Sequence, residues 1–136
     1  MLFYEILVEY ERQTGEDNPG RVKETYLVEG LTPADVQMRL HQEIAPFIFG
    51  DYEYPSCKRV QFFEVFPSGK SYWYKAKVEM ITVDGDKETR KAVNILLEAD
   101  TVHDAVAVLD DKLQSYDCEV ISIAKTPIMD ILRGVN

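Results

Sequence analysis

The stretch Phe66–Ser71, with the sequence FPSGKS, divides the chain into two halves that resemble each other. Before it, Tyr4–Glu9 reads YEILVE, and after it Tyr74–Glu79 reads YKAKVE. Further along each half, Thr32–Asp35 matches Thr101–Asp104, and Asp51–Phe66 matches Asp117–Leu132. Such self-similarity predicts that one supersecondary unit occurs twice.

The length of 136 residues suits a single domain built from both copies. We place copy one at residues 1–66, a linker at 67–72 and copy two at 73–136. Two copies are too few for a solenoid, so we expect one domain with an approximate internal two-fold axis. The alternative is that two amphipathic stretches look alike by chance.

Charge and composition indicate a soluble, cytoplasmic protein. The net charge is −9, with 24 acidic and 15 basic residues, which disfavours nonspecific binding to nucleic acid or to an anionic membrane. The start of the chain lacks the basic region of a signal peptide, and no apolar run approaches the roughly 18 residues of a membrane span. Cys57 and Cys118 form no disulfide framework, so we expect reduced thiols.

Hydrophobic periodicity in copy one predicts two strands, a helix and a third strand. Residues alternate over Tyr4–Glu11, and a returning strand covers 22–28. Thr32 suits a helix N-cap, and apolar residues spaced four apart predict the buried stripe of that helix: Val36, Leu40 and Ile44. The third strand is predicted from Tyr54 to Val65.

Copy two predicts the same order. Strands over 74–80 and 89–97 flank the tight-turn pair Asp84-Gly85. A helix after Thr101 has a predicted stripe of Ala105, Val106, Leu109 and Leu113. A last strand, Glu119–Ala124, precedes a short apolar tail at 128–132. The fold class is therefore α+β, a tandem ββαβ repeat with two helices on mainly antiparallel sheet. Whether the copies share one sheet or pack helix to helix stays open.

No catalytic, metal or cofactor site is predicted. Gly69-Lys70-Ser71 resembles the end of a phosphate-binding loop, but Glu64 occupies the position of the motif's first glycine. His41 and His103 occupy non-equivalent positions on the two helices and are predicted to be surface residues. We therefore expect a non-enzymatic protein without a cofactor, with an enzyme as a third alternative.

Two groups of residues are candidate binding sites. Aromatic side chains gather in the connection after the first helix: Phe47, Phe49, Tyr52 and Tyr54. Aromatics on a loop are typical anchors for a partner, and the alternative is that these residues cap the open end of the core. A basic patch is formed by Lys75, Lys77, Arg90 and Lys91, with Lys87 beside it, and the alternative for this patch is a solvated face.

Several motifs resemble one family. They are WYKxKV at Trp73–Val78, YLV at Tyr26–Val28, ExAPFIxG at Glu43–Gly50 and TPIMD at Thr126–Asp130. They are similar to a domain of unknown function in small proteins of Bacteroides-group bacteria and their phages and mobile elements. Phe3 stands where Trp73 would lead us to expect tryptophan. The resemblance implies a short intracellular protein and brings no catalytic residues.

The leading hypothesis is an interaction or sequestering protein of phage or mobile-element type that binds a host protein or small ligand. The alternative is a nucleotide or single-stranded nucleic-acid binder that uses the basic patch. We also expect a homo-oligomer held through the first strands of the copies. In it the acidic row Glu5, Glu9 and Glu11 would meet Lys75 and Lys77, with apolar contacts from Phe3, Leu7 and Trp73.

Overall fold

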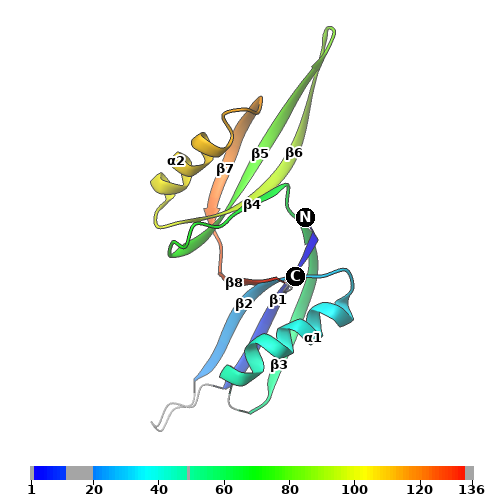
Figure 1. The fold of residues 1–136 in the computed structure, drawn as a ribbon, viewed down its shortest axis with the longest axis vertical. Coiled ribbons are helices and arrows are strands. Elements are labelled where there is room, and N and C mark those ends of the chain that lie inside the picture. Colours follow the sequence, from blue (N-terminus) through cyan, green and yellow to red (C-terminus); the bar gives the residue numbers. More distant parts are fainter. Residues whose placement is uncertain (1, 12–19, 49, 134–136) are drawn as a thin grey trace. The chain divides into compact units, whose positions relative to one another are not determined.

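A computed structural model describes residues 2–11, 20–48 and 50–133. The described chain divides into two compact units. The first unit combines residues 2–61 with the segment that begins at Pro127, and the second unit is Phe62–Thr126. Each unit contains one four-stranded, mainly antiparallel sheet and one helix (Figure 1). The predicted α+β class, with two helices packed on mainly antiparallel sheet, is confirmed, and the question of one sheet or two is resolved in favour of two.

The two sheets have the same strand order. In the first unit the elements are β1 (Leu2–Glu11), β2 (Arg21–Glu29), α1 (Pro33–Ile44), η1 (Ala45–Phe47), β3 (Tyr52–Gln61) and β8 (Ile128–Leu132), in the sheet order β3-β1-β2-β8. In the second they are β4 (Glu64–Phe66), β5 (Tyr72–Asp84), β6 (Lys87–Ala99), α2 (Val102–Lys112) and β7 (Cys118–Lys125), in the order β4-β6-β5-β7. Read from opposite ends, the two orders correspond strand by strand.

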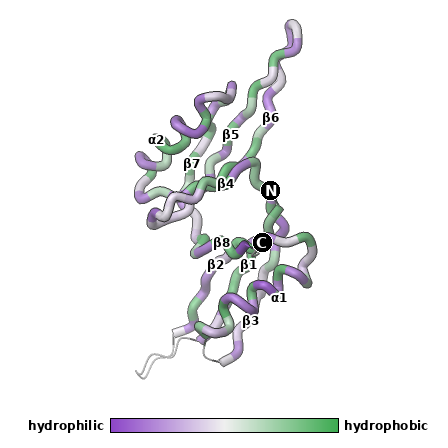
Figure 2. Tube along the Cα trace, viewed as in Figure 1, coloured by the Kyte–Doolittle hydropathy of each residue, from purple (hydrophilic) through white to green (hydrophobic). Residues whose placement is uncertain are grey.

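Each helix begins at a threonine cap. The Thr32 hydroxyl accepts a hydrogen bond from the Asp35 amide at 3.2 Å, and the Thr101 hydroxyl accepts one from the Asp104 amide at 3.1 Å. Both caps satisfy a backbone amide that the first turn of a helix leaves without a partner. Figure 2 shows hydrophilic and hydrophobic residues interspersed along both helices, as expected for helices with one buried side.

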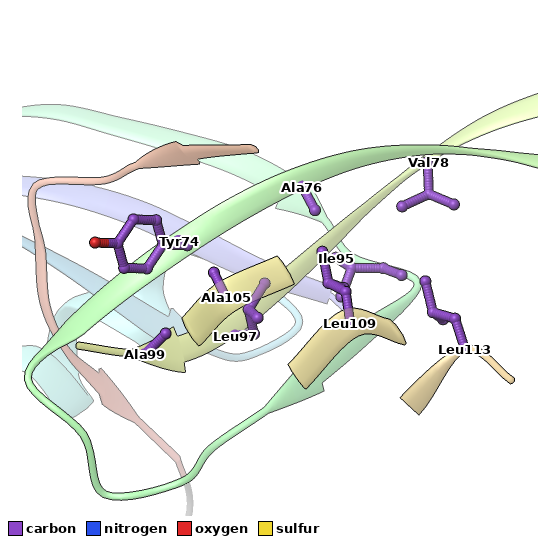
Figure 3. Close-up of a cluster of buried hydrophobic side chains, with 9 residues drawn as sticks. All are labelled: Tyr74, Ala76, Val78, Ile95, Leu97, Ala99, Ala105, Leu109 and Leu113. Carbon is purple, nitrogen blue, oxygen red and sulfur yellow. The ribbon is translucent and has the colours of Figure 1, made fainter. Parts of the chain in front are cut away.

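The predicted helix stripes form the cores of the two units, with one exception. Val36, Leu40 and Ile44 are buried in the first unit among Tyr4, Ile6, Val8 and Val28. In the second unit Ala105, Leu109 and Leu113 are buried against β5 and β6, as Figure 3 shows. Val106 was wrongly assigned to the stripe: its side chain is 41% exposed, because it follows Ala105 by 100° around the helix and so turns away from the sheet.

The pairing registers of the two sheets are also equivalent. Leu7 pairs with Ser56 and Glu9 with Glu53, and at the matching positions Lys77 pairs with Ser122 and Glu79 with Glu119. A register shift separates these pairs at the same place in both units. The repeat therefore extends to individual cross-strand pairs and to an irregularity of the edge strand. The predicted turn after Asp84 is confirmed, with Gly85 at a φ of 63°, a conformation that favours glycine.

The last strand of each copy lies in the sheet of the other copy. β4 follows β3 in sequence but pairs in parallel with β6, so that Val65 lies opposite Leu96. β8 follows β7 but pairs in parallel with β2, so that Ile131 lies opposite Leu27. The predicted continuous strand from Tyr54 to Val65 was wrong: β3 ends at Gln61, and the chain passes into the second unit before β4 begins. The repeated segment is accordingly ββαββ, with its fifth strand exchanged.

Candidate functional site

Three strands of the first unit place a group of polar aromatic residues on the helix-covered side of the sheet. Tyr10 on β1 lies opposite Val22 of β2 and Tyr52 of β3. Tyr10, Tyr26 and Tyr52 all pack against the buried core beneath α1. We call the set Tyr10, Glu24, Tyr26, His41 and Tyr52 the tyrosine cluster.

The carboxylate of Glu24 connects two hydroxyls of this cluster. Tyr26 donates to Glu24 Oε2 at 3.1 Å, and Tyr10 donates to Oε1 of the same carboxylate. Partial burial raises the pKa of Tyr26 well above its ordinary value, and the negative charge of Glu24 raises it further. Tyr26 therefore stays protonated as a donor at neutral pH.

On the β3 side, the cluster reaches α1 through a histidine. His41 Nδ1 lies 2.9 Å from the Tyr52 hydroxyl, and the two rings are stacked with centroids 5.9 Å apart. Tyr54 continues the group: its ring lies 6.5 Å from that of Tyr52, and its hydroxyl donates to Gln37 Oε1 at 3.3 Å. Burial, followed by the neighbouring Tyr54, raises the pKa of Tyr52.

Only part of the predicted aromatic group packs against the core. Phe47, the last residue of η1, is 88% exposed, and Tyr54 is 41% exposed. Tyr52 is half-buried and belongs to the tyrosine cluster. Phe49 lies outside the described residues. The structure thus brings Tyr52 and Tyr54 together, and it presents Phe47 as an apolar side chain on the surface.

A hollow of about 370 Å³ opens beside Tyr10 and Tyr52. Its lining includes four carboxylates and one guanidinium: Glu9, Glu11, Asp51, Glu53 and Arg21. Arg21 binds Glu9 through Nε at 3.1 Å and Glu53 through Nη2 at 3.0 Å. The hydrogen bond from Arg21 is the main cause that lowers the pKa of Glu9. The hollow is consequently acidic even with its arginine counted.

The same arginine bridge occurs in the second unit. Arg90 on β6 binds Glu119 on β7 at 2.6 Å and Glu79 on β5 at 3.2 Å, and Glu88 lies 3.5 Å away. Hydrogen bonds to Glu119 and Glu79 are the main causes that raise the pKa of Arg90. Arg90 matches Arg21 in the repeat, and its partners Glu79 and Glu119 match Glu9 and Glu53.

The structure does not assemble the predicted basic patch on one surface. Lys75 and Lys77 are exposed on the face of β5 opposite to the Tyr74, Ala76 and Val78 side chains that form the core. Arg90 and Lys91 are consecutive on β6, so their side chains point to opposite faces. Arg90 is moreover surrounded by three carboxylates, which leaves Lys75 and Lys77 as the exposed cations of that face.

The four strand residues of the tyrosine cluster have no tyrosine or glutamate at the equivalent positions of the second unit. At the positions matching Tyr10, Glu24, Tyr26 and Tyr52 stand Met80, Val93, Ile95 and Cys118. Sequence reasoning missed Tyr10, Glu24, Tyr26 and His41, although a signal was available for the three strand residues. Aligning the two copies shows polar residues in copy one at positions that are apolar in copy two.

The loop that resembles a phosphate-binding motif is engaged by carboxylates. The amides of Ser68 and Gly69 donate to Glu98 Oε1 at 3.1 and 3.4 Å, and the Ser71 amide donates to Asp100 at 3.0 Å. Lys70 forms an ion pair with Asp104 at 2.7 Å. The donors that would hold a phosphate therefore already have anionic partners within the unit.

Two of the three apolar side chains expected to hold a homo-oligomer are buried, and the third, Leu7, is half-buried. Phe3 is fully buried and Trp73 is 7% exposed, so these apolar groups cannot contact a second chain in this structure. Glu9, in the predicted acidic row, is already paired with Arg21 and Lys23. The alternation of apolar and polar residues predicts the side of the strand on which Phe3 and Trp73 lie, but it does not predict that this side is buried at these positions.

Neither helix within the described ranges has the length and apolar character that a membrane crossing requires. Among the same residues, no three or more histidine, cysteine, aspartate or glutamate side chains form a group suited to a metal ion.

Comparison with known proteins identifies the family alone. No curated protein matches the chain significantly, and neither does any solved structure. One family model matches residues 2–134, which is almost the whole chain. The protein therefore belongs to the family described as Domain of unknown function (DUF4494).

Proposed function

We propose that the protein is a non-enzymatic interaction protein that binds a host protein, or a small ligand, through its first unit. The observation that carries the proposal is the difference between two otherwise equivalent units. Only copy one places the tyrosine cluster beside an acidic hollow, where copy two has Met80, Val93, Ile95 and Cys118. We further propose that it acts in the cytoplasm and serves a phage or mobile element.

Phe47 supports a protein partner. An 88% exposed phenylalanine keeps its ring in water, and a partner with an apolar pocket would remove most of that ring surface from solvent. Tyr54 and Tyr52 lie on the β3 side of the same connection and add aromatic surface with hydroxyl groups. Exposed aromatic residues of this kind are enriched among those that dominate binding energy.

The charge of the hollow favours basic groups on the partner. Its lining carries Glu9, Glu11, Asp51 and Glu53 against the single cation Arg21. A carboxylate-rich surface on a chain of net charge −9 attracts lysine or arginine side chains and repels phosphate. This favours a protein partner over the alternative of a nucleotide or single-stranded nucleic acid.

Affinity capture with matched variants tests the proposal. Phe47→Ala and Tyr54→Ala should each reduce recovery of the captured partner at least tenfold, while the unfolding midpoint stays unchanged. Val83→Ala, at a 63% exposed position of the second unit, serves as the control and should keep full recovery.

Native mass spectrometry of the purified protein separates the possible occupants. A bound protein whose signal disappears with Phe47→Ala supports the proposal. A nucleotide or oligonucleotide that is lost with Lys75→Ala and Lys77→Ala, and kept with Phe47→Ala, would establish the alternative in its place.

A further inference from the structure

We infer that the C-terminal strand β8 can be exchanged between two copies of this chain, giving a dimer in which β2 of each chain pairs with β8 of the other. The inference concerns assembly and is independent of the proposed function. Its basis is the strand exchange that the chain already makes within itself.

Both sheets are completed by a strand from the other copy of the repeat. β4 pairs with β6 with Glu64 opposite Ile95 and Phe66 opposite Leu97. β8 pairs with β2 with Asp130 opposite Tyr26 and Leu132 opposite Val28. In the alignment of the copies, these are the same pairs. In each unit, one edge of the second strand of the repeat, β2 or β6, thus pairs with a parallel strand from the other copy.

Parallel pairing does not need a short covalent link between the two strands. An antiparallel pair can be joined by a two-residue turn, but a parallel strand must arrive by a longer route. β8 pairs with β2, yet it follows β7, which belongs to the second unit. The pairing itself therefore does not require that β8 and β2 belong to one chain.

The segment before β8 has the properties of a hinge. Only Thr126 and Pro127 lie between the end of β7 and the start of β8. The Thr126 amide and hydroxyl donate to the Trp73 carbonyl at 2.8 and 2.9 Å, so Thr126 is held in the second unit, and the segment that belongs to the first unit begins at Pro127. Short connections of this kind favour exchange between chains.

Exchange preserves what β8 contributes to the first unit. Ile128 is 8% exposed, and Leu132 packs against the core beneath α1. A chain with β8 released would expose Ile128 and leave the edge of β2 without its ladder. When two such chains pair reciprocally, Ile128 is buried again and β2 regains its ladder, because every contact of β8 with β2 is reproduced. The equilibrium then depends on concentration and on the geometry of the hinge.

Disulfide trapping tests the inference in the full-length chain. Cys57 and Cys118 are first replaced by serine. One chain then carries Tyr26→Cys and the other carries Asp130→Cys, at positions that lie opposite each other in the β2–β8 pair. The two chains are unfolded together, refolded at high concentration and oxidised. A disulfide-linked heterodimer is expected, because its cysteines meet only when β8 has moved between chains.

Two controls keep the result decisive. A single chain that carries both cysteines is refolded at low protein concentration and should form the disulfide within itself. If it closes and the mixture yields no heterodimer, the inference is wrong. If it does not close, light scattering of the unmodified chain refolded at high concentration decides: a purely monomeric mass overturns the inference, and a dimer that reverts on dilution and refolding supports it.

The hinge length provides an independent test. Deleting Thr126 should raise the dimer fraction severalfold, because β8 then reaches its own β2 less easily. Inserting Gly-Ser after Pro127 should lower it, since a longer hinge favours closure within one chain. Equal dimer fractions in both variants would contradict the exchange of β8.

Discussion

The two units share a framework and differ in what that framework carries. Strand order, cross-strand register, the edge-strand irregularity and the arginine bridge all occur twice. The helix-covered side of the sheet differs, because Glu24 lies between two tyrosines where the second unit has Val93 between Met80 and Ile95. The second unit thus shows that the fold does not require these polar groups.

This difference bears on why the polar groups are present. A carboxylate on the helix-covered side of a sheet loses hydration, and its hydrogen bonds only offset that loss. An aliphatic residue at the same position avoids the penalty, as Val93 does in the second unit. Stability alone therefore does not account for Glu24, which supports a role of the tyrosine cluster in binding.

Truncation of the matched core leucines should have the largest effect on stability. Leu40 and Leu109 occupy the same position of the two helices, with exposures of 0% and 1%. Leu40→Ala and Leu109→Ala should each lower the free energy of unfolding by about 2–5 kcal/mol, because each leaves a cavity in a packed core. Urea titration followed by circular dichroism measures both, with Val106→Ala as a surface control. An unchanged midpoint in either variant would remove the equivalence of the two cores.

Exchanging the residues at positions 24 and 93 should have the next largest effect. Val93→Glu places a carboxylate between Met80 and Ile95 without a hydroxyl donor from either, so it should cost about 1–3 kcal/mol. Glu24→Val leaves the Tyr10 and Tyr26 hydroxyls without their acceptor and should also destabilise. Adding Tyr10→Met and Tyr26→Ile should recover part of that loss. If Val93→Glu were neutral, the two helix-covered surfaces would not differ as described.

The repeat explains how much of this fold was predictable. Alternation over Tyr4–Glu11 and the capped helix after Thr32 are local signals, and both are confirmed. The exchange of β4 and β8 was not predictable from such signals. Val65 and Ile131 are apolar strand residues whichever sheet receives them, and the choice of sheet depends on tertiary contacts.

The candidate site was predictable only in part. Phe47, Tyr52 and Tyr54 were identified because aromatics cluster in one connection. Glu24 escaped notice because a single acidic residue in an alternating strand usually faces solvent. Its position follows from strand parity: Tyr26 and Val28 continue the same side of β2 toward the core. Arg90 was predicted to belong to a basic patch because other basic residues lie near it in the sequence. The carboxylates that pair with it, Glu79 and Glu119, lie on other strands, so the local sequence did not reveal them.

High pH should distinguish the two units through Tyr26. Its pKa is raised in the folded state, so the folded protein holds the phenolic proton more tightly than the unfolded chain. The associated stability is present below the unfolded pKa of about 10 and is lost as the pH rises above it. Unfolding midpoints measured between about pH 9 and 11 should fall for the unmodified protein and less for Tyr26→Phe. Parallel curves for the two proteins would argue against a protonated Tyr26 donor.

The smallest expected effect belongs to the arginine bridges. Arg21 and Arg90 are partly exposed, so their ion pairs are screened by salt and contribute little. Arg90→Met should destabilise more than Arg21→Met, because it leaves Glu79, Glu88 and Glu119 facing one another without a cation. Both losses should grow at low ionic strength.

The contribution of the Arg21 bridge to stability should depend on pH. Because the pKa of Glu9 is lowered in the folded state, the stability that the bridge contributes is present above the unfolded pKa of about 4.3 and is lost as the pH falls through the folded value. Arg21→Met should therefore differ from the unmodified protein at neutral pH and converge with it in acid. If Arg21→Met instead destabilises the first unit equally at all pH values, the bridge acts through packing of the arginine side chain, and the two units differ in their surfaces as well as beneath their helices.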